Sequence, residues 1–75
     1  MGRLYDCNKG ERLEVVKLHA DEALKHRLIS FGIMKGSQLE IVELAPRKKT
    51  IEIKVEKMRI ALRAEEAQMI EVKPV

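Results

Sequence analysis

The segment HRLISFGIMKGSQLEIVEL, residues 26–44, changes its hydrophobic period halfway along, and this change restricts the fold more than any other feature of the chain. Leu24, Leu28 and Phe31 stand at i, i+4 and i+7, a spacing that places them on one face of a helix. After Gly36, apolar and polar residues alternate, which is the pattern of a half-buried strand. The sequence therefore predicts a helix that passes into a strand through a tight corner.

The expected helix has clear signals at both ends. Asp21 is a natural N-cap, because its carboxylate can accept hydrogen bonds from the free N–H groups of the first turn. Gly32 follows the last residue of the apolar face, where a left-handed backbone costs least without a Cβ atom. These signals predict a helix over about residues 21–31.

Two further strands follow, joined by a short turn. Apolar and polar residues alternate on both sides of Glu56 and Lys57, which predicts a β-hairpin around these two residues. The apolar positions are Ile51, Ile53 and Val55 in the first strand, and Met58, Ile60 and Leu62 in the second.

The remaining segments add two strands and a helical turn. Residues 11–18 have a strand-like composition, although the pair Val15 and Val16 leaves open which side faces the core. A helical turn is expected at 64–67, followed by a short strand from Ile70. About five short strands and one helix predict a mainly β fold, in the form of a small barrel that leaves few free edges.

The length of 75 residues predicts a single domain, 1–75. A chain of this size buries only about 60 to 65% of its unfolded surface, so one small core must suffice. That core must be aliphatic, because Tyr5 and Phe31 are the only aromatic residues.

The compartment is also indicated by the sequence. A lone cysteine, Cys7, cannot form an internal disulfide, and the N-terminal residues do not begin an apolar signal segment. No apolar run approaches the roughly 18 residues that a membrane-spanning helix needs. We therefore expect a cytoplasmic protein that does not insert into the membrane.

Two segments together, HRLISFGIMKGSQLEIVELAP and IEIKVEKMRIALRAEEAQMIEV, resemble the ferrous iron transport protein A (FeoA) family. The shared pattern is Arg-Leu-apolar-x-apolar-Gly at a helix end, a strand after a glycine, an Ala-Pro turn, Ile-Ala-Leu-Arg, and a closing Glu-Ala-x-x-Ile-x-Val. The match extends over about residues 10–72.

This resemblance implies an SH3-like barrel with a helix inserted after the first strand. It also implies a cytosolic accessory protein of FeoB, a ferrous iron transporter with a G-protein domain. Two positions depart from the family pattern. Residues 47–50, Arg-Lys-Lys-Thr, replace a Pro and a Gly-Asp, and Lys57 stands where glycine is common. Because a two-residue hairpin turn needs positive φ, we expect this hairpin to be longer or bulged.

Residues that could carry chemistry are few and scattered. His19, His26 and Cys7 are the most suggestive metal ligands, but they share no helical spacing, whereas iron or zinc requires three or four convergent donors. Ser30 and Ser37 have no neighbouring base that would activate a nucleophile. We therefore predict no metal site, no cofactor and no enzymatic activity.

Basic charge is concentrated in the segment 47–63. It holds seven basic and two acidic residues, a net charge of +5, whereas the rest of the chain has eight basic and ten acidic residues, a net charge of −2. A solvated strand edge is one explanation of this charge. The others are an acidic protein partner, the anionic cytoplasmic leaflet, or nucleic acid.

Nucleic-acid binding by this basic 47–63 hairpin is the alternative function. Binders of single strands stack bases on aromatic side chains, at about 1 to 3 kcal/mol per base. Only Tyr5 is expected to be free for stacking, since Phe31 lies on the core face of the helix. Charge alone would give weak, salt-sensitive binding.

Two sets of residues are candidates for binding a protein partner. The first is apolar and comprises Ile29, Met34 and Leu44, at the edge of the helix face and where the strand alternation breaks. These could be explained without a partner, by a wide helix face and by a bulge that turns Leu44 into the core. The second set is basic and comprises Arg47, Lys48 and Lys49.

Overall fold

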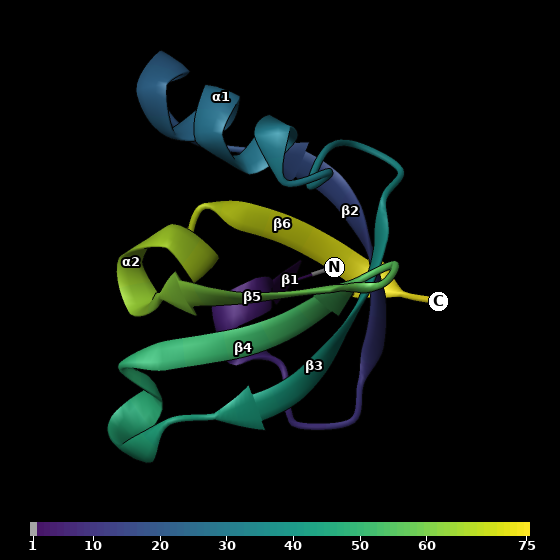
Figure 1. The fold of residues 1–75 in the computed structure, drawn as a ribbon, viewed down its shortest axis with the longest axis vertical. Coiled ribbons are helices and arrows are strands. Elements are labelled where there is room, and N and C mark those ends of the chain that lie inside the picture. The colour runs from purple at the N-terminus through teal and green to yellow at the C-terminus, as the bar shows by residue number, and fades with distance from the viewer. Residues whose placement is uncertain (1) are drawn as a thin grey trace.

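The computed structural model describes residues 2–75, and its main element is one antiparallel sheet of six strands in the order β1-β6-β2-β3-β4-β5 (Figure 1). The strands are β1 (Gly2–Arg3), β2 (Arg12–Leu18), β3 (Gln38–Leu44), β4 (Thr50–Val55), β5 (Met58–Arg63) and β6 (Ile70–Pro74). The helices are α1 (Glu22–Ser30) and α2 (Ala64–Ala67), with 3₁₀ turns η1 (Leu4–Asp6) and η2 (Pro46–Lys48). The mainly β fold, the inserted helix and the later helical turn are confirmed.

One strand was not foreseen in the sequence. The pair Gly2–Arg3 forms the short strand β1, which lies beside β6 with Gly2 opposite Val72 and Arg3 opposite Glu71. Two residues are too few to show an alternating pattern, so only the tertiary pairing reveals them. The strand count is therefore six rather than about five.

Helix α1 begins and ends as its sequence predicts. The carboxylate of Asp21 accepts a hydrogen bond from the N–H of Leu24 at 2.9 Å. At the other end Gly32 has φ of +86°, and the N–H groups of Gly32 and Ile33 donate to the carbonyls of Ile29 and Leu28, at 2.9 Å each. This is the Schellman arrangement, which stops the helix and turns the chain towards β3.

Two bulges settle the strand registers that the sequence left open. Between Val15 and Lys17 the pairing of β2 with β6 shifts, so Val16 is the extra residue and the inward side passes from Val15 to Leu18. A bulge adds one residue to its strand and so reverses which residues face the core beyond it. In both strands the extra residue is a valine that follows another β-branched residue, which is why the alternation in the sequence breaks at these pairs.

The second bulge lies in β3. Its pairing with β4 shifts between Ile41 and Glu43, so Val42 is extra and Leu44 pairs with the inward-facing Ile51. Leu44 is partly buried and packs against the core. The interpretation of this break as a bulge that turns Leu44 inwards is therefore confirmed.

The turn between β4 and β5 is shorter than expected. Val55 pairs directly with Met58, so only Glu56 and Lys57 lie between the strands, and the expected longer or bulged hairpin is wrong. The positive φ falls on Glu56, at +56°, and not on Lys57. The turn is thus kept at two residues by a non-glycine residue in a left-handed conformation.

The core is aliphatic and continuous, and an ion pair closes one side of it. Leu4, Leu28 and Ile33 are fully buried, and most of the inward residues of the strands are buried as well. Glu66 of α2, only 6% exposed, is ion-paired with the guanidinium of Arg27 on α1 and accepts the N–H of Arg63 at 2.8 Å. The two helices are joined by this pair of charges.

Candidate partner-binding surface

The corner between α1 and β3 is held rigid by one hydroxyl. The Oγ atom of Ser37 donates to the carbonyl of Gly32 at 2.7 Å and accepts the N–H of Met34 at 3.0 Å. The N–H of Gly36 also donates to the carbonyl of Val15 at 2.8 Å. Met34 therefore belongs to a fixed loop, and its side chain is 42% exposed.

A groove of about 580 Å³ lies between this corner and the β4–β5 turn. Its apolar residues are Phe31, Met34, Val55 and Met58, and Glu56 and Lys57 stand at one side. Met58 is 47% exposed, even though its place in the alternation of β5 predicts an inward side chain. It lies at the first position of the strand, opposite the buried Val55, and its position next to the turn is the signal in the sequence that could have indicated its exposure.

The three apolar candidates from the sequence do not form one surface. Met34 lines the groove; Ile29 is 41% exposed but is not among the residues that line it. Leu44 packs against the core at the other end of β3. The structure thus replaces Ile29 and Leu44 by Phe31 and Met58 as neighbours of Met34.

The basic turn η2 lies at the opposite end of the molecule from α1 (Figure 1). Lys48 is not a free charge, because its Nζ atom donates to the carbonyl of Tyr5 at 3.2 Å and lies 5.5 Å from the centre of the Tyr5 ring. Arg47 and Lys48 both have positive φ, at +61° and +53°. Of the three basic candidates, Arg47 and Lys49 remain exposed.

Tyr5 is also less available than the sequence suggested. It is partly buried, packs against the core and lies beneath Lys48. The expectation of a free aromatic ring for base stacking is therefore wrong, because the turn η2 folds over that ring.

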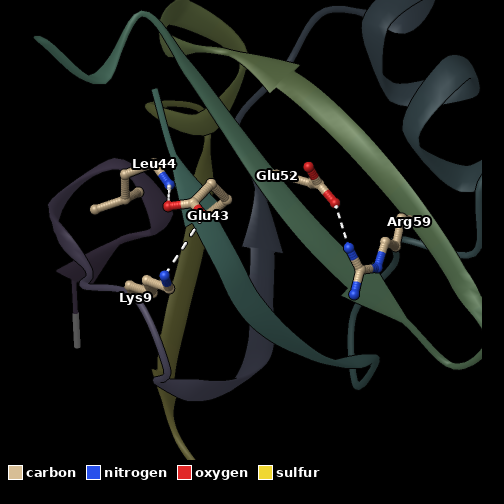
Figure 2. A network of polar contacts seen from close by, with 5 residues as sticks. All are labelled: Lys9, Glu43, Leu44, Glu52 and Arg59. Atoms are coloured by element: carbon tan, nitrogen blue, oxygen red, sulfur yellow. Dashed lines mark hydrogen bonds and ion pairs between the residues drawn. The ribbon is translucent and has the colours of Figure 1, made fainter. Parts of the chain in front are cut away.

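The outer face of the β4–β5 hairpin carries paired charges. Arg59 donates to the carboxylate of Glu52 at 3.2 Å across the two strands, as Figure 2 shows. On the neighbouring strand β3, Glu43, next to Leu44, lies 3.4 Å from Lys9 of the turn before β2 (Figure 2). Exposed pairs of this kind contribute only about 0.2 to 1 kcal/mol each, so they fix the side chains more than they stabilise the fold.

The residues that suggested metal chemistry lie apart, each with a local partner. His19 contacts Glu71 at 2.6 Å, and His26 lies 3.6 Å from Glu22 on the surface of α1. The Sγ atom of Cys7 donates to the carbonyl of Arg3 at 3.5 Å. Within residues 2–75, no three His, Cys, Asp or Glu side chains converge as metal ligands would.

Two titratable groups are shifted by these contacts. The hydrogen bond from His19 lowers the pKa of Glu71 below its ordinary value. Burial, followed by the neighbouring Glu11 carboxylate, raises the pKa of the Cys7 thiol to about 11. Cys7 is therefore a neutral thiol at physiological pH, which makes it a poor nucleophile and a poor metal ligand.

The two serines have structural partners. Ser30 donates to the carbonyl of Arg27 at 2.6 Å in the last turn of α1, and Ser37 holds the corner described above. Among the described residues, neither hydroxyl is hydrogen-bonded to a base. Among the features described, the groove is the one whose exposed apolar lining could contact another molecule.

Among the helices formed by residues 2–75, none has the length and apolar character needed to cross a membrane. The model of the FeoA domain family matches residues 2–74. A protein of Helicobacter pylori strain J99, named as a candidate Fe(2+) transport protein A, is 38% identical over 71 residues, which cover 93% of this chain and 91% of the relative.

Solved structures agree with this match. The solution structure of the FeoA protein from Chlorobium tepidum has a TM-score of 0.91 at 30% identity, and the overlap covers 97% of this chain and 70% of that one. A manganese-dependent transcriptional repressor in complex with manganese also has a TM-score of 0.91, at 22% identity. That overlap covers 99% of this chain but 36% of the repressor, so it shows a shared fold alone.

Proposed function

This chain belongs to the FeoA family, and on that premise we propose that it is a small cytoplasmic accessory protein of bacterial ferrous iron uptake. It acts by binding the cytosolic G-protein domain of a FeoB-type transporter, without catalysis and without a cofactor of its own. Ferrous iron is the cargo of the transporter in this proposal. The names of its relatives, which mention Fe(2+) transport, support the assignment to iron uptake.

The observation that carries a binding role is the groove of Phe31, Met34, Val55 and Met58. Two methionines beside an aromatic ring form an adaptable apolar surface, because the unbranched thioether fits differently shaped partners. A small domain that exposes such residues on a rigid corner is suited to hold another protein.

The alternative docking surface is the exposed basic pair at η2, namely Arg47 within the turn and Lys49 directly after it. Charges at an interface rim mainly accelerate encounter, whereas buried apolar residues usually hold a complex together. We therefore assign the main contact to the groove and a steering role to the basic turn.

The test measures binding kinetics to the transporter's cytosolic domain at low and high salt. Met34→Glu and Met58→Glu place an unpaired charge in a dried interface, so each should weaken binding by at least about 30-fold with little change in salt response. Met69→Glu is the matched control, because Met69 is 39% exposed but does not line the groove.

Arg47→Glu and Lys49→Glu should instead slow association and reduce its salt dependence. Lys48 is left unchanged, since its contact with Tyr5 would confuse stability with binding. If the groove variants bind like wild type, the groove is not the contact. If wild-type protein does not bind the domain at all, the proposed function is wrong.

A further inference from the structure

Strand β5 stands last in the sheet order, and among residues 2–75 it pairs with β4 alone. The two-residue turn makes Val55 and Met58 the first hydrogen-bonded pair of the hairpin. By the alternation of an antiparallel ladder, Ile60 and Leu62 also bond to β4, whereas Arg59 and Ala61 direct their N–H and C=O groups away from it. The outer edge of β5 is therefore a row of backbone groups that face outwards.

Within the part of the chain that the structure describes, this edge has no backbone partner. None of the backbone hydrogen bonds outside the strand ladders of residues 2–75 uses the N–H or C=O of Arg59 or Ala61. Both residues are exposed. Further along, the N–H of Arg63 is already bonded to Glu66, which marks the end of the free edge. Such an edge is a template for an added strand.

The side chains along the edge indicate what kind of strand fits. On the outer face of the hairpin, Lys54, Arg59 and Arg63 stand against one acidic residue, Glu52. An added strand would lie beside β5, so its side chains would come within about 5 Å of Arg59 and Arg63, while Lys54 and Glu52 lie one strand further away on β4. Acidic residues at alternate positions would be favoured there, and basic ones would be repelled.

The same charges argue against a second copy of this chain. A two-fold antiparallel pairing of β5 centred on Ala61 would place Arg59 of one copy opposite Arg63 of the other. Like charges directly opposite each other destabilise a strand pair. The occupant is therefore better sought in another protein.

We propose that the free edge of β5 binds an extended, acidic segment of the partner by strand addition, with the segment's apolar end seated in the groove at Met58. The inference rests on the proposed function, since it specifies how the partner is held. Continuity supports it, because Met58 is both the first residue of β5 and part of the groove lining. Backbone bonds then supply affinity, and the arginines select acidic side chains.

The decisive variant is Ala61→Pro, tested with the full chain against the transporter's cytosolic domain. Proline removes the outward N–H of Ala61 and its ring blocks an incoming strand, yet leaves the hydrogen bonds to β4 intact. Ala61→Val is the matched control, because it keeps the N–H and suits a strand. We expect at least tenfold weaker binding for Ala61→Pro, wild-type binding for Ala61→Val, and little change in the melting temperature of either.

Hydrogen exchange supplies a readout that a merely structural role would not move. The amides of Arg59 and Ala61 should exchange rapidly in the free protein and become protected in the complex. Arg63→Glu, which reverses one of the arginine charges, should weaken binding of the same domain. If wild-type protein binds but Ala61→Pro binds equally well, or these amides stay unprotected, strand addition is wrong while the proposed function stands. Self-association that Ala61→Pro abolishes would assign the edge to a second copy and overturn the acidic segment.

Discussion

At the scale of single residues, Glu56 occupies a conformation that its side chain disfavours. Its φ of +56° lies in the left-handed region, which costs L-residues roughly 1 kcal/mol. Lys57, its neighbour in the same turn, has negative φ. The sequence comparison with the FeoA pattern drew attention to Lys57, but the structure places the strain one residue earlier.

Glu56→Gly should therefore raise the free energy of unfolding, by about 0.5 to 1 kcal/mol, because glycine relieves the left-handed strain. Lys57→Gly should lower it by about 0.4 to 1 kcal/mol, since it adds only freedom to the unfolded chain. Urea denaturation of both variants checks the pair. Shifts of the same sign would show that the turn does not have the conformation described.

Cys7 gives a second prediction at this scale. With a thiol pKa of about 11, mainly raised by burial, Cys7 should be almost wholly protonated at pH 8. An unfolded cysteine has a pKa of about 8.5, so a substantial fraction is the reactive thiolate. Alkylation by iodoacetamide should therefore be at least about tenfold slower in the folded protein than in urea. The folded rate should rise by about tenfold per pH unit between pH 8 and pH 10. Equal rates would contradict the raised pKa.

At the scale of elements, α1 depends on a few side chains for its place on the sheet. Leu28 is fully buried, and Arg27 reaches the buried Glu66 of α2. These residues belong to the two ends of the sequence pattern, the Arg-Leu helix end and the closing Glu-Ala. The structure gives that pattern a physical reason, because a buried carboxylate needs a charged partner.

Leu28→Ala should lower the free energy of unfolding by about 2 to 5 kcal/mol, through lost burial and the cavity left behind. Ile29→Ala is the control on the same helix, since Ile29 is 41% exposed, and it should cost well under half as much. Denaturant midpoints of the two variants measure the difference. An unchanged midpoint for Leu28→Ala would mean that α1 does not pack as described.

The elements that the sequence could predict are those with local signals. Asp21 and Gly32 mark the ends of α1 by their own side-chain chemistry, so no tertiary information was needed. The sequence could not show which face of the sheet Val16 and Val42 occupy, because the position of a bulge depends on the pairing with the partner strand. The exposure of Met58 could not be predicted for a similar reason. The alternation of apolar and polar residues does not show which strand ends the rest of the chain leaves uncovered.

At the scale of the whole molecule, the two candidate surfaces lie at opposite ends. The groove lies between the α1–β3 corner and the β4–β5 turn. Turn η2 lies at the other end of β4 (Figure 1), and there Lys48 contacts Tyr5. The sequence alone could not show that the two surfaces are far apart, because Met34 and Arg47 are close together along the chain.

This arrangement also bears on the alternative function, nucleic-acid binding by the basic 47–63 hairpin. Base stacking needs an exposed ring, and Tyr5 is packed between the core and Lys48. Lys48 donates to the Tyr5 carbonyl and Arg59 is paired with Glu52, so these two side chains are less free to contact phosphates, although the net charge of the segment is unchanged. Binding would then depend on a few phosphate contacts, which weaken steeply as salt rises.

Gel-shift assays with mixed single-stranded RNA and DNA should therefore show no retention at micromolar protein and about 150 mM salt. Any binding at lower salt should be independent of sequence and should fall further in Arg47→Glu and Lys49→Glu, whose side chains are the exposed charges of η2. Met69→Glu is the control, because it adds one negative charge at an exposed residue elsewhere on the surface. Met58→Glu would be less informative, since Met58 begins the basic strand β5. The opposite outcome is retention at about 150 mM salt that persists in Arg47→Glu and Lys49→Glu but is lost in Arg59→Glu. That outcome would favour nucleic acid over a protein partner and would place the nucleic acid on the outer face of β5.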